Sequence, residues 1–158
     1  MNSALNLLRI DHIAIQASNL AQSESWYCDL FGLERRWELT SFADRTKKRL
    51  PGIQRLVELA AGDIRLHIFD RSRDETPWSL DERAPQFQHI AVAFASIDEL
   101  HEVRKRWVEL YSSGRYTFAL DEQPTAVSSD GDGVSSFYAF DLDGLEIEFV
   151  HVADGGGE

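Results

Sequence analysis

Phe137 to Val150 reads Phe-Tyr-Ala-Phe-Asp-Leu-Asp-Gly-Leu-Glu-Ile-Glu-Phe-Val, which predicts two β-strands joined by a tight Asp-Leu-Asp-Gly turn. Alternate side chains of a strand share one face, so we expect Leu145, Ile147 and Phe149 to enter an apolar layer while Glu148 points the other way. A half-buried carboxylate is costly unless it is paired, hydrogen-bonded or bound to a metal. The hairpin therefore raises the question of which other side chains meet Glu148.

The composition is typical of a globular protein without a disulfide. The chain has 158 residues, is 43% hydrophobic and carries a formal net charge of -11. That charge disfavours nucleic acids and anionic membranes as partners, and we interpret the short basic run from Arg45 to Arg49 as a solvated loop. Cys28 is the single cysteine, and the chain contains no long apolar run resembling a signal peptide or a membrane span. We therefore expect a cytoplasmic protein.

The first half of the chain predicts a strand, a helix and three further strands. Arg9 to Gln16 alternates as a strand does and places His12 on the face opposite its aliphatic residues. A helix follows, with Asn19 near its start and Gly32 at its end. The other expected strands are Leu33–Leu39, Gln54–Ala60 and Ile64–Phe69, with a polar loop between the first two. The last of these strands places His67 on its polar face.

The second half repeats that order. Residues 71–86 are charged and contain two prolines, which is typical of a connector. Phe87 to Phe94 is then an expected strand with His89 opposite its aliphatic residues. Ser96 and Glu99 form a capping box at the start of a helix that ends before Gly114. The remaining expected elements are a strand at Tyr116–Leu120, a polar loop at Asp121–Gly133 and the closing hairpin.

The two halves form an internal duplication with potential metal ligands at equivalent positions. His12-Ile-Ala-Ile and His89-Ile-Ala-Val open the two halves, and His67 in the fourth strand of the first half corresponds to Glu148 in the fourth strand of the second. A lone histidine on a strand is more often a hydrogen-bonded residue than a ligand. The repeated placement of three imidazoles and one carboxylate nevertheless predicts a divalent metal site, if the two halves close around one cup.

The other two histidines lack this support. His101 falls on the second helix, and His151 has the strand parity opposite to that of Glu148. We expect both to be structural or exposed to solvent. Zinc, nickel, cobalt, manganese and ferrous iron all accept mixed nitrogen and oxygen ligands, so the residues do not choose among them.

The two His-Ile-Ala strands and the segment from Tyr138 to Glu148 resemble motifs of the vicinal oxygen chelate superfamily, which includes glyoxalase I, methylmalonyl-CoA epimerase, fosfomycin-resistance thiol transferases, extradiol dioxygenases and bleomycin-binding proteins. The likeness implies an α+β fold in which two tandem βαβββ modules form an open, cupped, mixed β-sheet around a metal. The expected parts of this single domain are module 1 at 7–70, the connector at 71–86, module 2 at 87–152 and a flexible tail at 153–158.

The same resemblance implies roles for individual residues. His12, His89 and Glu148 stand where the family has its three usual ligands. His67 stands where glyoxalase-like members carry a fourth ligand, usually Glu or Gln, so it departs from the family pattern. Members of the superfamily are mostly dimers, and exposed sheet edges also favour a homodimer or a higher homo-oligomer.

The predicted reaction is proton transfer next to a carbonyl, as in a metal-dependent isomerase, epimerase or lyase acting on a small α-hydroxyketone, ketose-like sugar, cyclitol or 2-oxo compound. Glu148 is the candidate base, or it is a ligand with no basic role. Arg65 and Tyr138 are candidate substrate-binding residues, although a surface cation and a packing role explain them as well. The loop at Asp121–Gly133 is a candidate lid or a simple turn.

Two other functions remain open from the sequence. An Fe(II) extradiol-type dioxygenase would use two histidines and one carboxylate, and a fourth protein ligand argues against it. A protein that binds or modifies an antibiotic is the other alternative. A binder without chemistry would not need four ligand-type residues at these positions.

Overall fold

The computed structural model describes residues 10–71, 88–129 and 133–153. Contacts divide the chain into two compact units, the first made of Met1–Glu24 and Gly32–Asp74 and the second of Ser25–Phe31 and Glu75–Glu158. The expected connector at 71–86 and the tail at 153–158 lie almost wholly outside the described residues. In the described part of the chain, no helix combines the length and the apolarity that crossing a membrane requires.

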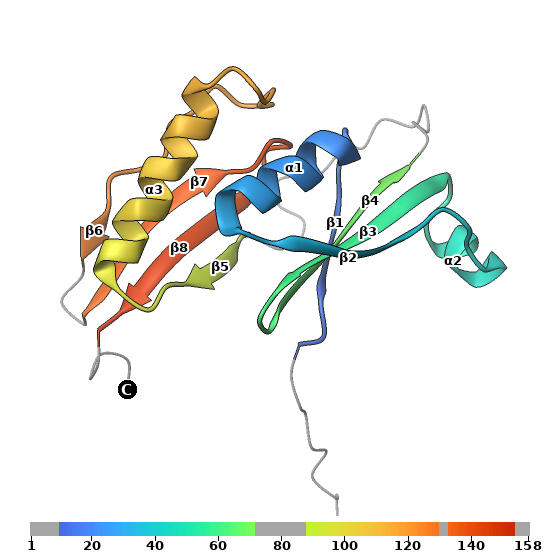
Figure 1. Ribbon diagram of the computed structural model, residues 1–158, viewed down its shortest axis with the longest axis horizontal. Helices are drawn as coiled ribbons and strands as arrows, with labels where there is room; N and C mark the ends of the chain where they lie inside the picture. Colours follow the sequence, from blue (N-terminus) through green and yellow to red (C-terminus); the bar gives the residue numbers. More distant parts are fainter. Residues whose placement is uncertain (1–9, 72–87, 130–132, 154–158) are drawn as a thin grey trace, which may run out of the picture. The chain divides into compact units, whose positions relative to one another are not determined.

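The first unit contains a four-stranded mixed sheet (Figure 1). The strands in the order β1-β4-β3-β2 are Ile13–Gln16, Ile64–Arg71, Ile53–Ala61 and Glu34–Leu39. Strand β1 runs parallel to β4, and the other neighbours are antiparallel. Strand β1 is shorter than predicted, because residues 10–12 precede it without pairing as a strand and Arg9 lies outside the described residues.

The loop predicted between the second and third strands contains a short helix instead, α2 (Asp44–Arg49). This helix holds the basic cluster, and none of its residues is buried. Its first residue is acidic and its last three are basic, which stabilises the helix through its dipole. A prediction from the spacing of apolar residues does not detect such a helix. The cluster is therefore solvated, as predicted, but it is helical.

The second unit repeats the topology of the first. Its strands in the order β5-β8-β7-β6 are Ile90–Ala93, Glu146–Val152, Val134–Phe140 and Ser128–Ser129. Strand β5 is parallel to β8, as β1 is to β4. The structure thus confirms the α+β class and the two tandem βαβββ modules, each with its own mixed sheet.

Two helices begin and end where the sequence places them. Helix α1 spans Leu20–Phe31, and Asn19 Oδ1 accepts a hydrogen bond from the backbone N–H of Gln22 at 3.2 Å. Gly32 follows with φ of 68°, which is the usual glycine stop. Helix α3 spans Ile97–Ser112, and Ser96 Oγ accepts from the Glu99 N–H. The serine half of the expected capping box is therefore present, while Glu99 Oε2 accepts the backbone N–H of Ala95, one residue before the cap.

The prediction of a strand at Tyr116–Leu120 is wrong. The second strand of this module is β6, which lies inside the predicted polar loop. Tyr116 is buried, and the ring of Phe118 packs against Trp107 and Tyr111 of α3 instead of alternating on a sheet. Strand β6 is a short exposed edge that pairs with β7 through backbone groups and through the hydroxyls of Ser129 and Ser135, so it needs no apolar pattern. The alternation of apolar residues therefore predicted a strand in the apolar segment and did not detect the polar strand β6.

The closing hairpin has the predicted turn, built around Asp141. Its buried Oδ1 accepts the backbone N–H groups of Asp143 and Leu145, and Oδ2 accepts the hydroxyl of Tyr27 at 2.9 Å. Burial raises the pKa of Asp141, although these hydrogen bonds oppose the rise. Gly144 has φ of 85°, a conformation that other residues rarely adopt.

The apolar layer of the second unit is centred on Phe149, with one correction to the sequence prediction. Phe149 stacks on Phe137 at 4.4 Å between ring centroids, and Phe31 and Phe94 also stack on it. Ile147 is buried as predicted, whereas Leu145 is 41% exposed. Leu145 precedes the first residue of β8 and ends the turn, so strand alternation does not extend to it.

Candidate functional site

In the first unit, the two predicted ligands His12 and His67 lie face to face. His12 directly precedes β1 and His67 is in β4; their rings stack with centroids 3.7 Å apart and planes 16° apart. Trp37 of β2 meets the His67 ring edge-on at 4.9 Å. The His67 side chain is 13% exposed and that of His12 is 37% exposed. The parallel pairing of β1 with β4 brings these two residues together.

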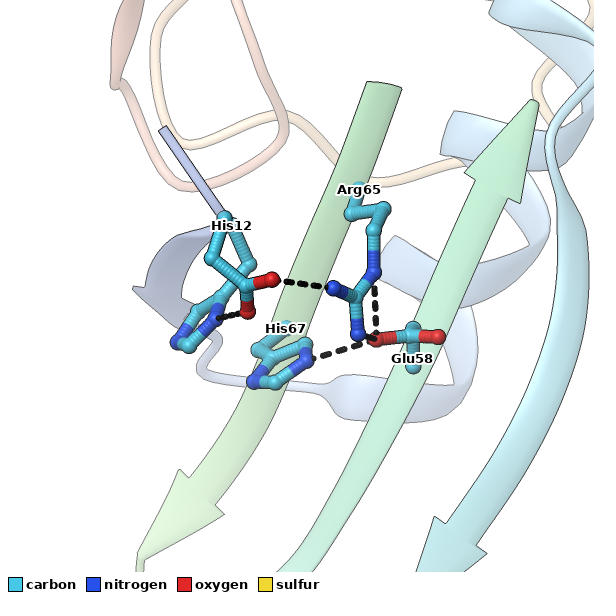
Figure 2. Close-up of polar contacts among 5 residues, drawn as sticks. His12, Glu58, Arg65 and His67 are labelled. Atoms are coloured by element: carbon cyan, nitrogen blue, oxygen red, sulfur yellow. Dashed lines mark hydrogen bonds and ion pairs between the residues drawn. The ribbon is translucent and has the colours of Figure 1, made fainter. Parts of the chain in front are cut away.

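Glu58 is a buried residue of this site that the sequence analysis missed. It lies on β3 directly across from His67, and its Oε2 is 2.8 Å from His67 Nε2 (Figure 2). Its side chain is 6% exposed. Burial alone would raise the pKa of Glu58, but hydrogen bonds from Arg65 and His67 outweigh it and lower that pKa. A single acidic residue within the apolar run Leu56-Val57-Glu58-Leu59-Ala60 was the available signal.

Arg65, a predicted substrate-binding residue, is held by two carboxylates. Its Nε and Nη2 donate to Glu58 Oε2 at 3.1 and 2.5 Å, and its Nη1 donates to Asp11 Oδ1 at 2.6 Å. Asp11 Oδ2 also lies 2.9 Å from His12 Nδ1. A chain of polar contacts therefore runs from His12 through Asp11, Arg65 and Glu58 to His67. Figure 2 shows its part from Arg65 through Glu58 to His67.

In the second unit, His89 and Glu148 also come together. His89 Nε2 lies 3.2 Å from Glu148 Oε2, and the hydroxyl of Tyr138 donates to Glu148 Oε1 at 2.9 Å. Donating this bond to a carboxylate leaves the pKa of Tyr138 above its usual value, so its hydroxyl stays protonated near neutral pH. Glu146, which the sequence analysis did not single out, lies 3.8 Å from His89 Nδ1.

The two pairs occupy equivalent positions in strand register. His67 pairs with Ala14 of β1 and with Glu58 of β3, while Glu148 pairs with Ala91 of β5 and with Tyr138 of β7. Register therefore confirms the correspondence of His67 and Glu148 that the repeat predicted. It also shows that Glu58 and Tyr138 are counterparts.

The donor chemistry of these pairs fits a divalent metal. Three imidazoles and one carboxylate are ligands that zinc, nickel, cobalt, manganese and iron accept. The structure brings the predicted ligands together two by two, one pair within each unit. Within residues 10–71, 88–129 and 133–153, no group of three His, Cys, Asp or Glu side chains is placed to hold an ion.

The remaining histidines lie apart from both pairs. His101 is exposed on α3, and His151 Nδ1 is 3.0 Å from the backbone carbonyl of Phe94. Their predicted solvent-exposed and structural roles agree with these positions. The predicted lid at 121–133 includes β6, and residues 130–132 lie outside the described part of the chain.

Comparison of the sequence with models of protein families shows the superfamily to which the chain belongs. Residues 9–149 match the Glyoxalase/Bleomycin resistance protein/Dioxygenase superfamily. The chain belongs to this superfamily. A search of curated proteins found no match.

Solved structures with the superfamily fold cover nearly the whole chain. A lactoylglutathione lyase from Agrobacterium tumefaciens is 23% identical, with a TM-score of 0.58, and the match covers 90% of this chain and 92% of the lyase. A fosfomycin resistance protein from Listeria monocytogenes, in complex with Mn(II) and sulfate, is 16% identical, with a TM-score of 0.60 and coverages of 95% and 98%.

A third superfamily structure, a glyoxylase/bleomycin resistance protein/dioxygenase domain from Frankia sp. EAN1pec, is 16% identical, with a TM-score of 0.68 and coverages of 95% and 96%. All three identities are below 25%, so these likenesses show the fold alone. What this superfamily member does must be argued from its own residues.

Proposed function

We propose that this protein is a metal-dependent isomerase, epimerase or lyase that moves a proton next to a carbonyl of a small oxygenated substrate. The substrate classes that suit such a site are α-hydroxyketones, ketose-like sugars, cyclitols and 2-oxo compounds. The observation that carries the proposal is the repeated pair of donors, His12 with His67 and His89 with Glu148, at equivalent register positions of a superfamily fold.

We propose His12, His67, His89 and Glu148 as ligands of a divalent ion. When bound, such an ion would act as a Lewis acid that stabilises negative charge on substrate oxygens. The Mn(II) in the Listeria fosfomycin resistance protein supports a metal in this fold, although it does not identify the metal of this chain.

Glu148 is the proposed base, and its two oxygens have different surroundings. Oε2 faces His89, whereas Oε1 accepts the hydroxyl of Tyr138. A carboxylate oxygen that already accepts a hydrogen bond is a weaker base. We therefore propose that Tyr138 turns its hydroxyl to a substrate oxygen, which frees Oε1 to accept the proton from carbon.

Arg65 would contribute to substrate binding through one nitrogen. Nε and Nη2 are committed to the buried Glu58, but Nη1 binds Asp11, whose side chain is 60% exposed. An ion pair with an exposed partner is weak, because water screens the two charges. An anionic substrate group could therefore replace Asp11 at Nη1.

Proton exchange without oxygen tests the proposed reaction. The metal-loaded protein is incubated anaerobically in deuterated water with panels of α-hydroxyketones, cyclitols and 2-oxo thiol adducts. We expect metal-dependent deuterium uptake at a carbon next to a carbonyl, measured by NMR or mass spectrometry, and its loss in Glu148→Gln. Ferrous-iron-dependent oxygen consumption with a catechol would instead establish the dioxygenase alternative. Tight binding or modification of an antibiotic without carbon-bound exchange would establish the resistance alternative.

We also propose that the protein acts as a homodimer or higher homo-oligomer in the cytoplasm. Its single cysteine and net charge of -11 are consistent with that compartment. Strands β2 and β6 are edges of their sheets, and such edges are often covered by a partner. Light scattering at micromolar concentration checks the assembly, and a mass of 18.0 kDa, that of one chain, would contradict it.

A further inference from the structure

We propose that Glu58 is a positioning residue that fixes the tautomer of His67, so that His67 offers Nδ1 and not Nε2 as its donor nitrogen. This inference deepens the proposed metal site. It rests on the proposed function for the claim that Nδ1 binds a metal ion.

The hydrogen bonds at Glu58 determine which atom carries the proton. Oε2 of Glu58 accepts from Nε and Nη2 of Arg65, and a guanidinium has donors only. An oxygen that receives two such donors has no room for a proton of its own. The contact between Oε2 and His67 Nε2 at 2.8 Å therefore requires that Nε2 is the donor. In a neutral imidazole, Nδ1 is then the nitrogen with the free lone pair.

The surroundings of His67 hold its ring in the orientation that this bond requires. Glu58 and His67 are direct partners in the β3–β4 register, so the backbone places their side chains on one face. The His12 ring stacks on one face of the imidazole, and the Trp37 ring packs against it in a T-shaped arrangement. Tilting the ring out of its plane would break both ring contacts, and a half-turn within that plane would break the Glu58 bond.

The second nitrogen of His67 is available for a ligand. Within the part of the chain that the structure describes, neither His67 Nδ1 nor His12 Nε2 makes a hydrogen bond. In Figure 2 these two nitrogens lie on the same side of the stacked rings, away from Arg65. The stack therefore presents these two ring nitrogens in one direction.

Arg65 makes a buried carboxylate tolerable at this position. An unpaired carboxylate with 6% exposure would cost several kcal/mol, and a two-nitrogen contact with a guanidinium offsets that cost. A carboxylate that accepts the other ring N–H of a ligating histidine fixes its orientation and raises its basicity. Glu58 is paired with a guanidinium and accepts the ring N–H of His67, whereas an acid on the surface would not be held in this way.

The second unit places a supporting residue at the corresponding position. Tyr138 is the counterpart of Glu58 in register, and it donates to Glu148, the counterpart of His67. In both units, therefore, the strand next to the proposed metal ligand supplies the side chain that orients that ligand. Only the direction of the hydrogen bond is reversed.

Nitrogen NMR of the full-length, metal-free protein tests the tautomer directly. Long-range proton–nitrogen correlation is recorded at about pH 8.5, where an ordinary imidazole is neutral. The His67 signals are assigned by their loss in His67→Gln. We expect one protected proton on Nε2 and none on Nδ1, with faster exchange of that proton in Glu58→Gln. A proton on Nδ1, or an Nε2 proton that exchanges as fast in the wild type as in Glu58→Gln, would overturn the proposal.

Metal affinity supplies a second readout, with Co²⁺ as the probe followed by its visible absorption. Loss of such a supporting residue typically costs 10–100-fold in metal affinity, and we expect a loss of this order, roughly 10–100-fold, for Glu58→Gln. Glu38→Gln is the matched control, because Glu38 is paired with Arg55 on the same sheet and belongs to neither donor pair. Equal affinity in Glu58→Gln and wild type would contradict the role of Glu58.

The NMR and Co²⁺ experiments distinguish a failure of the proposed metal function from a failure of the proposed role of Glu58. If the wild type binds no Co²⁺, the proposed metal function fails, and the tautomer measurement alone decides the role of Glu58. If Glu58→Gln does not fold, as circular dichroism would show, the protection of the wild-type Nε2 proton still decides it.

Discussion

Replacing Glu148 by Gln is expected to lower the bound divalent metal from about one ion per chain to nearly none. An amide is a much weaker ligand than a carboxylate, and its NH₂ group would face His89 Nε2 at the position where Oε2 now lies 3.2 Å away. Elemental analysis of the purified variant measures the loss. The shape of the side chain is nearly unchanged, so the fold should survive.

Matched variants sharpen this metal prediction. His12→Ala and His89→Ala should also lose the ion, whereas His101→Ala and Glu102→Gln should keep it, because both control residues are exposed on α3. Full metal content in folded His12→Ala, His89→Ala and Glu148→Gln proteins would show that the proposed ligands are wrong.

A large loss of stability is expected from Phe149→Ala, at about 3–5 kcal/mol in the free energy of unfolding. The Phe149 ring is fully buried and stacks on Phe137, Phe31 and Phe94, so truncation leaves a cavity bordered by three rings. Urea denaturation followed by circular dichroism measures the change.

Leu145→Ala is the control for this effect. Sequence alternation assigned Leu145 to the same apolar layer as Phe149, but the structure leaves it 41% exposed. Its truncation should therefore cost less than about 1 kcal/mol. Equal losses for the two variants would mean that Leu145 is buried in solution.

Much of the fold could be predicted because its signals are local. The alternation of Ile147 and Phe149, the glycine after α1 and the serine before α3 each report the conformation of their own segment. The repeat added long-range information, because equivalent strands of a duplicated module must pair in equivalent registers. It correctly predicted that His67 and Glu148 occupy corresponding positions in the two sheets.

The parts that could not be predicted depend on contacts between distant segments. Strand β6 has no apolar pattern, and only its pairing with β7 makes it a strand. Glu58 acquires its role from Arg65 and His67, which lie on the next strand. A pattern within β3 shows only that an acid interrupts an apolar run. The partners that stabilise it depend on the register between strands.

The matching registers of the two modules also bear on how such a protein can change. One backbone arrangement holds a carboxylate beside an imidazole in the first module and a phenol beside a carboxylate in the second. Each position therefore exists twice, and a mutation can alter the charge of one copy while its twin keeps the original chemistry. A duplicated scaffold of this kind allows metal preference or proton affinity to change by mutation of one module at a time, while the strand pairing of both sheets is kept.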